Sequence, residues 1–154
     1  SGVLSNPMAS KHEEYFNSIA ELTSQVNTYQ FDFNKANTRL KAYERNLSYL
    51  KKNNAELTKK VYDLMAAMNT LNAALYGSKA KQQIGEKTEP SINSFLWKAR
   101  GTSNSYGPTQ LHMESFDIAK TMFGDIQPKL DSYFEQIKAL GILMEEAGAP
   151  AILD

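Results

Sequence analysis

Apolar residues recur in alternating steps of four and three positions through the first half of the chain. The stripe consists of Tyr15, Ile19, Leu22, Val26, Tyr29, Phe33, Ala36, Leu40, Tyr43, Leu47, Leu50, Leu57, Val61, Leu64, Met68, Leu71 and Leu75. This spacing places the apolar side chains on one face of a helix, and such a face has to be buried against other helices. The pattern therefore predicts long amphipathic helices packed in a bundle.

Signals for the ends of helices divide this pattern into elements. Ser10 followed by Glu13 fits a capping box, so the first helix is expected to start near Lys11. Gly77 is a natural stop for the second helix, and Pro90 precedes a short third one. The expected helices are 11–50, 54–76, 91–100 and a last one from 108 or 109 to 148, with polar loops at 78–90 and 101–108.

The pair Asn53-Asn54 leaves two alternatives open for the first two helices. In one, a single helix continues through the pair, and Asn54 is a buried polar residue that sets the register. In the other, the chain turns at the pair, because asparagine tolerates the left-handed conformation at a helix end. We favour the hairpin, because a single long rod would leave its apolar face uncovered unless it dimerised.

The last helix carries a second stripe with the same four-three spacing. Its members are His112, Phe116, Ala119, Phe123, Ile126, Leu130, Tyr133, Ile137, Leu140 and Met144. Pro128 lies inside this stripe, and a proline ring clashes with the carbonyl group four residues earlier. That residue is Gly124, which gives the backbone room to bend. A kink is therefore expected there and not a break.

Together these elements predict an all-α fold, an antiparallel helical bundle of three long helices plus one short helix. The first and last helices have matching lengths and can pack side by side, so that the second and the short helix share the remaining groove. Crossing angles of about 20° are expected for such a bundle. We assign residues 1–9 to the remnant of a linker from an upstream domain and residues 10–150 to the bundle.

Composition excludes several classes of function. The 154 residues include 17 basic and 17 acidic side chains, so there is no basic excess of the kind that marks nucleic-acid binding. The pairs Lys51-Lys52 and Lys59-Lys60 are interpreted as solvated helix surface. The chain has no cysteine, which excludes disulfides, thiolate metal sites and cysteine nucleophiles. No apolar run approaches the length of a membrane span.

No pattern of reactive residues indicates catalysis or a cofactor. A di-iron bundle needs Glu-x-x-His pairs, and neither His12 nor His112 has a glutamate three positions earlier. His112 is expected at the edge of the core with a local hydrogen bond, and His12 is expected to be exposed. The acidic pairs Glu13-Glu14 and Glu145-Glu146 lie near helix ends, where solvation or the helix dipole explains them. We predict no catalytic, metal-binding or cofactor-binding residue, and hence no enzyme.

Aromatic residues off the main stripe are the candidate partner-binding sites: Phe31, Trp97, Arg100 beside that tryptophan, and Tyr106. Phe31 points well away from the apolar face and could cover the underside of loop 78–90 or contact a neighbouring domain. Trp97 is interpreted either as an anchor that pins its short helix to the bundle, which we favour, or as a hot spot for a partner. Tyr106, in the second loop, fits either role.

Three stretches together resemble a known family. They are Leu71–Gly77 before a polar loop, Ser94–Arg100 leading to Gly107–Thr109, and Glu145–Pro150 near the end. These stretches are similar to the C-terminal helical domain of large bacterial proteins that carry BNR-repeat, sortilin-like β-propellers. Such proteins are typical of Bacteroidetes and are often labelled glycosyl hydrolases. Val3–Met8 is similar to the Val-x-x-Asp-Pro-Arg that closes the preceding β-domain, with asparagine and methionine in place of the acid and the arginine.

The resemblance implies a secreted or periplasmic parent protein whose propeller lies upstream, and it carries over no catalytic residue. The first functional hypothesis is a non-catalytic accessory domain that acts as a scaffold or docking module for that propeller or for another protein. The alternative is a carbohydrate-binding module in which Trp97, Tyr106 and loop 101–108 contact the sugar. A self-associating coiled coil is expected only if Asn53-Asn54 does not turn; otherwise we favour a monomer.

Overall fold

The computed structural model describes residues 7–78, 83–85, 90–101 and 107–152. These residues contain helices α1 (Pro7–Asn46), α2 (Ala55–Tyr76), α4 (Ile92–Arg100) and α5 (Gln110–Glu146), with a short 3-10 helix η1 (Leu47–Tyr49) after α1. The described part of the chain has no strand. The predicted all-α class, with three long helices and one short helix, is confirmed.

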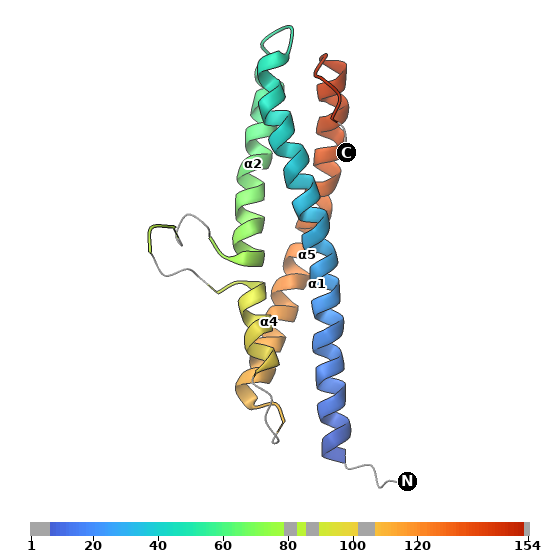
Figure 1. The fold of residues 1–154 in the computed structure, drawn as a ribbon, viewed down its shortest axis with the longest axis vertical. Helices are drawn as coiled ribbons and strands as arrows, with labels where there is room; N and C mark the ends of the chain where they lie inside the picture. Colours follow the sequence, from blue (N-terminus) through green and yellow to red (C-terminus); the bar gives the residue numbers. More distant parts are fainter. Residues whose placement is uncertain (1–6, 79–82, 86–89, 102–106, 153–154) are drawn as a thin grey trace.

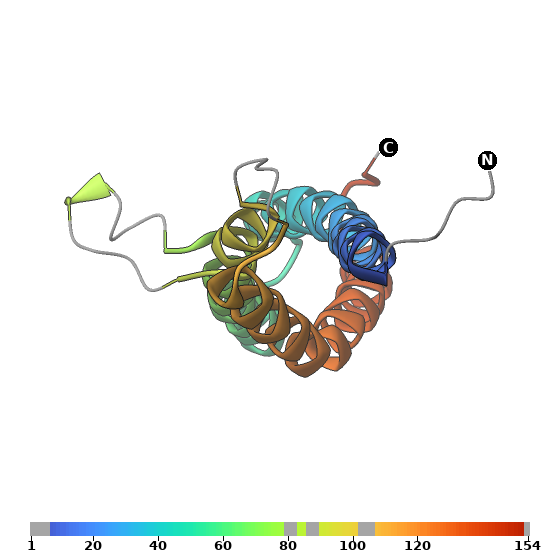
Figure 2. The ribbon, with the colours of Figure 1, turned by 90° about the horizontal axis from the view of Figure 1, so that it is seen from below.

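The helices form an elongated bundle in which α2 and α4 follow one another along one side, while α1 and α5 extend through the length (Figure 1). Seen along the bundle, the helices surround a common axis (Figure 2). Successive helices α1 and α2 run antiparallel, as do α4 and α5, whereas α1 and α5 run in the same direction. As the pattern predicted, the medium helix and the short helix share the groove left by the two long ones.

Helix α1 begins earlier than its capping signal indicated. Its first residue is Pro7 and not Lys11, so the predicted start is wrong and Ser10 lies inside the helix. Proline suits the first position of a helix because its φ angle is already helical and its missing N–H group would have no partner there. The proline signal therefore prevails over the Ser10–Glu13 pattern.

The chain turns between α1 and α2, which confirms the hairpin. After η1, Leu50 is extended, with φ −70° and ψ 140°. Asn54 also has an extended backbone, and its side-chain oxygen accepts a hydrogen bond of 3.0 Å from the backbone N–H of Leu57. Asn54 is therefore the N-cap of α2, a role that differs from the left-handed helix end that we expected.

The remaining helix starts are capped by side chains. Ser91 and Ser94 form a reciprocal capping box at the start of α4, and Thr109 and His112 form one at the start of α5. Helix α5 thus starts one residue after the expected position. In each box, two backbone N–H groups that a helix leaves without an internal partner are satisfied.

Glycine ends two of the long helices. Gly77, with φ 93°, follows α2, and its N–H donates to the carbonyl of Ala73 at 2.9 Å. At the end of α5, Gly148 donates to Glu145 and Ala149 donates to Met144, which is the Schellman pattern. Helix α5 continues through Pro128 without a break, as predicted.

The two apolar stripes form the core. Val26, Phe33 and Leu40 of α1 and Leu130 of α5 are fully buried. Phe33 packs against Tyr133, with ring centroids 5.6 Å apart. Within the described residues, no buried side-chain polar atom lacks a hydrogen-bond partner. The described core therefore combines buried apolar stripes with polar groups that are all hydrogen-bonded.

Candidate docking surface

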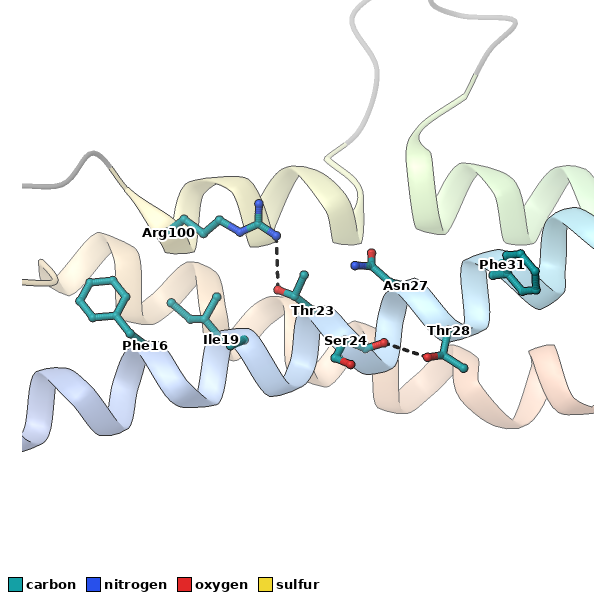
Figure 3. A pocket seen from close by; sticks show the side chains of 9 residues that line it. Phe16, Ile19, Thr23, Ser24, Asn27, Thr28, Phe31 and Arg100 are labelled. Atoms are coloured by element: carbon teal, nitrogen blue, oxygen red, sulfur yellow. Dashed lines mark hydrogen bonds between the residues drawn. The ribbon is translucent and has the colours of Figure 1, made fainter.

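A groove lies on the outer side of α1, beside the C-terminal part of α4 (Figure 3). We call it the α1–α4 groove. Its lining residues are Phe16, Ile19, Ala20, Thr23, Ser24, Asn27, Thr28 and Phe31 of α1 and Arg100 of α4. The groove is shallow and widely open to solvent, with a volume of about 750 Å³.

The lining of the groove has aromatic ends and a small-residue centre. Phe16 is 46% exposed and Phe31 is 66% exposed. They are fifteen positions apart in the helix, which corresponds to about 22 Å. Between them, positions such as Ala20, Ser24 and Thr28 carry short side chains. The outer side of α1 thus presents two large apolar side chains that flank a low region.

The helical period explains this second surface. Residues 16, 20, 23, 27 and 31 follow steps of three and four, as the core stripe does, but on another side of the helix. Phe31 was predicted to point away from the core, and this is confirmed. Most of loop 78–90, the other expected neighbour of Phe31, lies outside the described residues. Lys35, one turn further on, places its ammonium group 5.9 Å from the centre of the Phe31 ring.

Arg100 is the single charged residue that lines the groove in the described part of the chain. It is the last residue of α4, where a cation is favoured by the helix dipole. Its side chain reaches across to α1, where one guanidinium nitrogen donates to the hydroxyl of Thr23 at 3.4 Å (Figure 3). No carboxylate of the described residues pairs with this guanidinium.

Trp97 lies on α4 between two residues that bond to α1. Asn93, one turn before it, accepts a hydrogen bond of 2.8 Å from Gln30 of α1. Arg100, one turn after it, contacts Thr23 of α1. Trp97 itself is 74% exposed and is not among the residues that line the α1–α4 groove.

The interpretation of Trp97 as an anchor is wrong, because its side chain is 74% exposed. The anchors of α4 are instead the buried residues Ile92, Leu96 and Ala99. The hydroxyl of Tyr15 also donates to the carbonyl of Ala99 at 2.8 Å. Since α4 has only nine residues, these contacts fill its inner face and leave no room there for an indole ring. Tyr106, the remaining candidate, lies outside the described residues.

The two histidines both lie beside glycines that flank the second loop. His112 is half-buried, and its Nδ1 accepts from the N–H of Thr109 at 3.1 Å, which confirms the predicted local hydrogen bond. His12 was expected to be exposed, but it is half-buried, so that prediction is wrong. Its ring occupies the space where a side chain at position 107 would extend, and Gly107 makes this approach possible.

A second hollow lies between α1 and α5 and is partly closed by residues 149–152 of the chain itself. Its lining includes both acids, such as Asp32 and Glu145, and bases, such as Lys35 and Lys138. Ile152 packs against the core from this segment. Because the chain covers its own hollow here and the charges are mixed, this site indicates no class of ligand.

The ionisation of the buried tyrosines follows from packing. Burial raises the pKa of Tyr133, because a phenolate would be poorly solvated in the core. Burial is also the main reason that the pKa values of Tyr15 and Tyr76 are raised. Within the described residues, no cluster of histidine, aspartate or glutamate could hold a metal ion, and no helix is long and apolar enough to cross a membrane.

Comparison with protein-family models, with curated proteins and with solved structures finds no match to this chain.

Proposed function

We propose that this chain is a non-catalytic helical accessory domain that docks another polypeptide through the α1–α4 groove and Trp97. The observation that carries the proposal is the exposure of Phe16 and Phe31 at the two ends of a groove that Arg100 also lines. Arg100 pairs with no carboxylate of the described residues, and Trp97 is exposed on the same helix as Arg100. Tryptophan and arginine are enriched among the residues that dominate binding energy at protein interfaces. Grouped exposed apolar side chains at a groove mark interaction sites more often than scattered ones do.

The resemblance described above suggests where this domain works. We propose that it belongs to a larger secreted or periplasmic protein with a sortilin-like propeller, and that it acts there as a scaffold. The polypeptide in the groove would then be part of that propeller or of another protein of the cell envelope. Catalysis, if the parent protein has any, would lie outside this bundle.

Site-directed photo-crosslinking tests the docking proposal in cells that produce the full protein. A photoreactive amino acid at position 31 or position 97 is expected to form a covalent adduct with one defined polypeptide segment. The matched controls are Tyr62 and Tyr49, which are 55% and 68% exposed and lie outside the groove. Adducts that are absent, or equally strong from all four positions, would contradict the proposal.

Carbohydrate binding is a second candidate, and the exposure of Trp97 is the observation that favours it. A sugar ring could stack on the indole face, and a buried tryptophan would have excluded this. Because Trp97 is the only tryptophan of the chain, its fluorescence reports on this position alone. A glycan response that is lost in Trp97→Ala but unchanged in Phe31→Ser would favour sugar binding over protein docking.

A further inference from the structure

We infer that the bundle bends at a hinge near its middle, at the level where α2 ends and α4 begins. The hinge separates two halves of the described bundle. The lower half in Figure 1 contains α4 with the first parts of α1 and α5, and the upper half contains α2 with their last parts. The hinge does not depend on docking at the α1–α4 groove.

Contacts of α1 show that α2 and α4 meet at one level of the bundle. Gln30 of α1 donates to Asn93, in the first turn of α4, at 2.8 Å. One turn further along α1, Asn34 interacts with the hydroxyl of Tyr76, the last residue of α2. The column formed by α2 and α4 therefore has no continuous helix at this level, and no main-chain hydrogen bonds of a helix resist bending there.

Helix α5 lacks a main-chain hydrogen bond near the same level. Tyr29 of α1 bonds to both Gln127 and Asp131, at 3.1 and 2.9 Å, so this part of α5 lies beside Tyr29. Pro128 has no N–H group to donate to the carbonyl of Gly124, and prolines inside helices are common sites of bending. A side chain at Gly124 would meet no atom within 4 Å, so no neighbouring helix supports α5 at that position.

Helix α1 is continuous through this level, but its sequence there favours a helix only weakly. Of the twelve residues 27–38, only three are strong helix formers, namely Gln30, Lys35 and Ala36. The hydroxyls of Thr28 and Thr38 donate to carbonyls one turn earlier in α1, at 3.1 Å each, and such bonds often bend helices. Thus α1, α5 and the α2–α4 column each have a weak point at about the same level.

Side-chain hydrogen bonds at this level hold the helices in place while their directions change. Gln30, which is only 8% exposed, links α1 to α4, and the hydroxyl of Tyr29 links α1 to α5. A hydrogen bond tolerates deviations of about 30° from linearity, so these contacts can persist while one half tilts relative to the other. The polar contacts therefore form the pivot of the hinge.

Distances between spin labels test the hinge. The chain has no cysteine, so labels attach to introduced cysteines alone. One pair spans the hinge, with Lys98→Cys in α4 and Asn69→Cys in α2, and a control pair in the upper half combines Asn69→Cys with Lys138→Cys in α5. All three positions are exposed. The distribution of distances is expected to be about twice as wide for the spanning pair as for the control pair.

Restoring a regular α5 is expected to narrow the spanning distribution to the width of the control pair. The variant combines Gly124→Ala with Pro128→Ala, which supplies the missing N–H group and raises helix propensity. The matched control, Asn17→Ala, raises helix propensity at an exposed position of α1 far from the hinge and should leave the width unchanged. Circular dichroism establishes that the helices of each variant are intact.

Three results would overturn the inference. Equal widths for the two label pairs, without further substitutions, would show that the bundle is rigid at this level. A wide spanning distribution that the α5 variant does not narrow would show that the motion does not arise at Gly124 and Pro128. Equal narrowing by Asn17→Ala would attribute the effect to overall stability and not to a hinge.

Discussion

At the scale of single residues, buried polar side chains of the core form hydrogen bonds with side chains of neighbouring helices. Tyr133 is 1% exposed, yet its hydroxyl donates to the side-chain oxygen of Asn37 at 2.7 Å. Gln30, also buried, donates to Asn93 across the contact between α1 and α4. Such pairs fix neighbouring helices relative to each other, because a mispacked helix would leave a buried polar group without a partner.

Replacing Tyr133 should change how stability depends on pH. In the unfolded chain a tyrosine ionises near pH 10, whereas burial raises the pKa of Tyr133 in the folded protein. Above about pH 10 the unfolded state therefore binds fewer protons than the folded state, and this tyrosine makes stability fall as the pH rises. Urea unfolding between pH 8 and pH 11 should show a shallower fall for Tyr133→Phe, by at most about 1.4 kcal/mol per pH unit. Equal slopes would contradict the burial argument.

Removing a cap should weaken the short helix α4. Ser91 is buried and takes part in the capping box of α4, so Ser91→Ala leaves a backbone N–H group without its partner. A loss of about 1–2 kcal/mol in the free energy of unfolding is expected. Thr70→Ala is the control, because Thr70 is exposed within α2 and its hydroxyl bonds only to the preceding turn. That change should stay within about 0.5 kcal/mol.

The exposure of a side chain was predictable from the sequence where the helix is long enough to repeat its apolar pattern several times. Phe31 lies within a forty-residue helix, and its outward direction followed from the period alone. Trp97 lies off the apolar face that Ile92, Leu96 and Ala99 form on its nine-residue helix, so the spacing did indicate exposure, and the interpretation as an anchor went against it. His12 depends on Gly107, which is remote in sequence and which no local pattern connects to it.

At the scale of elements, the apolar period determined the helices, and competition between capping signals determined their ends. The four-three steps identified α1, α2 and α5 because each of these helices has enough turns to repeat the pattern. The start of α1 was misjudged because Pro7 and Ser10 both favour a helix start and the sequence does not rank them. Asn54 was correctly placed at a turn, but its side chain caps the following helix and not the preceding one.

Two glycines within α5 should respond in opposite ways to alanine. A side chain at Gly124 would meet no atom within 4 Å, so Gly124→Ala should raise stability by about 0.5–1 kcal/mol through helix propensity. A side chain at Gly141 would come within 2.5 Å of the hydroxyl of Tyr43, whose ring is buried. Gly141→Ala should therefore lower stability by about 1–3 kcal/mol. Thermal unfolding of both variants checks the signs, and two shifts in the same direction would contradict this packing.

At the scale of the whole molecule, the turn at Asn54 lets the chain bury its own stripes. At each level of the described bundle, α1 and α5 pack with either α2 or α4. The sequence predicted this division from helix lengths, but it did not place α4 beside the outer side of α1. The α1–α4 groove depends on that placement, and for this reason the sequence suggested its residues separately and not as one surface.

The closed core predicts a monomer in solution. Multi-angle light scattering should give a mass near 17.3 kDa, the mass of one chain, over a wide range of concentrations. A mass twice as large that persists on dilution would contradict the prediction. It would indicate that exposed side chains such as Trp97 and Phe31 are covered by a second copy.

Because α2 and α4 follow one another along one side, the molecule consists of two helical hairpins, α1–α2 and α4–α5, each with helices of unequal length. One piece is a hairpin of a long and a medium arm, and the other is a hairpin of a short and a long arm. Gly77 caps the C-terminal end of α2, and Ser91 caps the N-terminal end of α4. Each hairpin therefore contains the caps of its own helices at the junction. A chain cleaved between Gly77 and Ser91 should reassemble from its two fragments, since α4 of one fragment fits only beyond the end of α2 of the other. The bundle thus resembles a heterodimer of two hairpins, α1–α2 and α4–α5, that are connected in one chain.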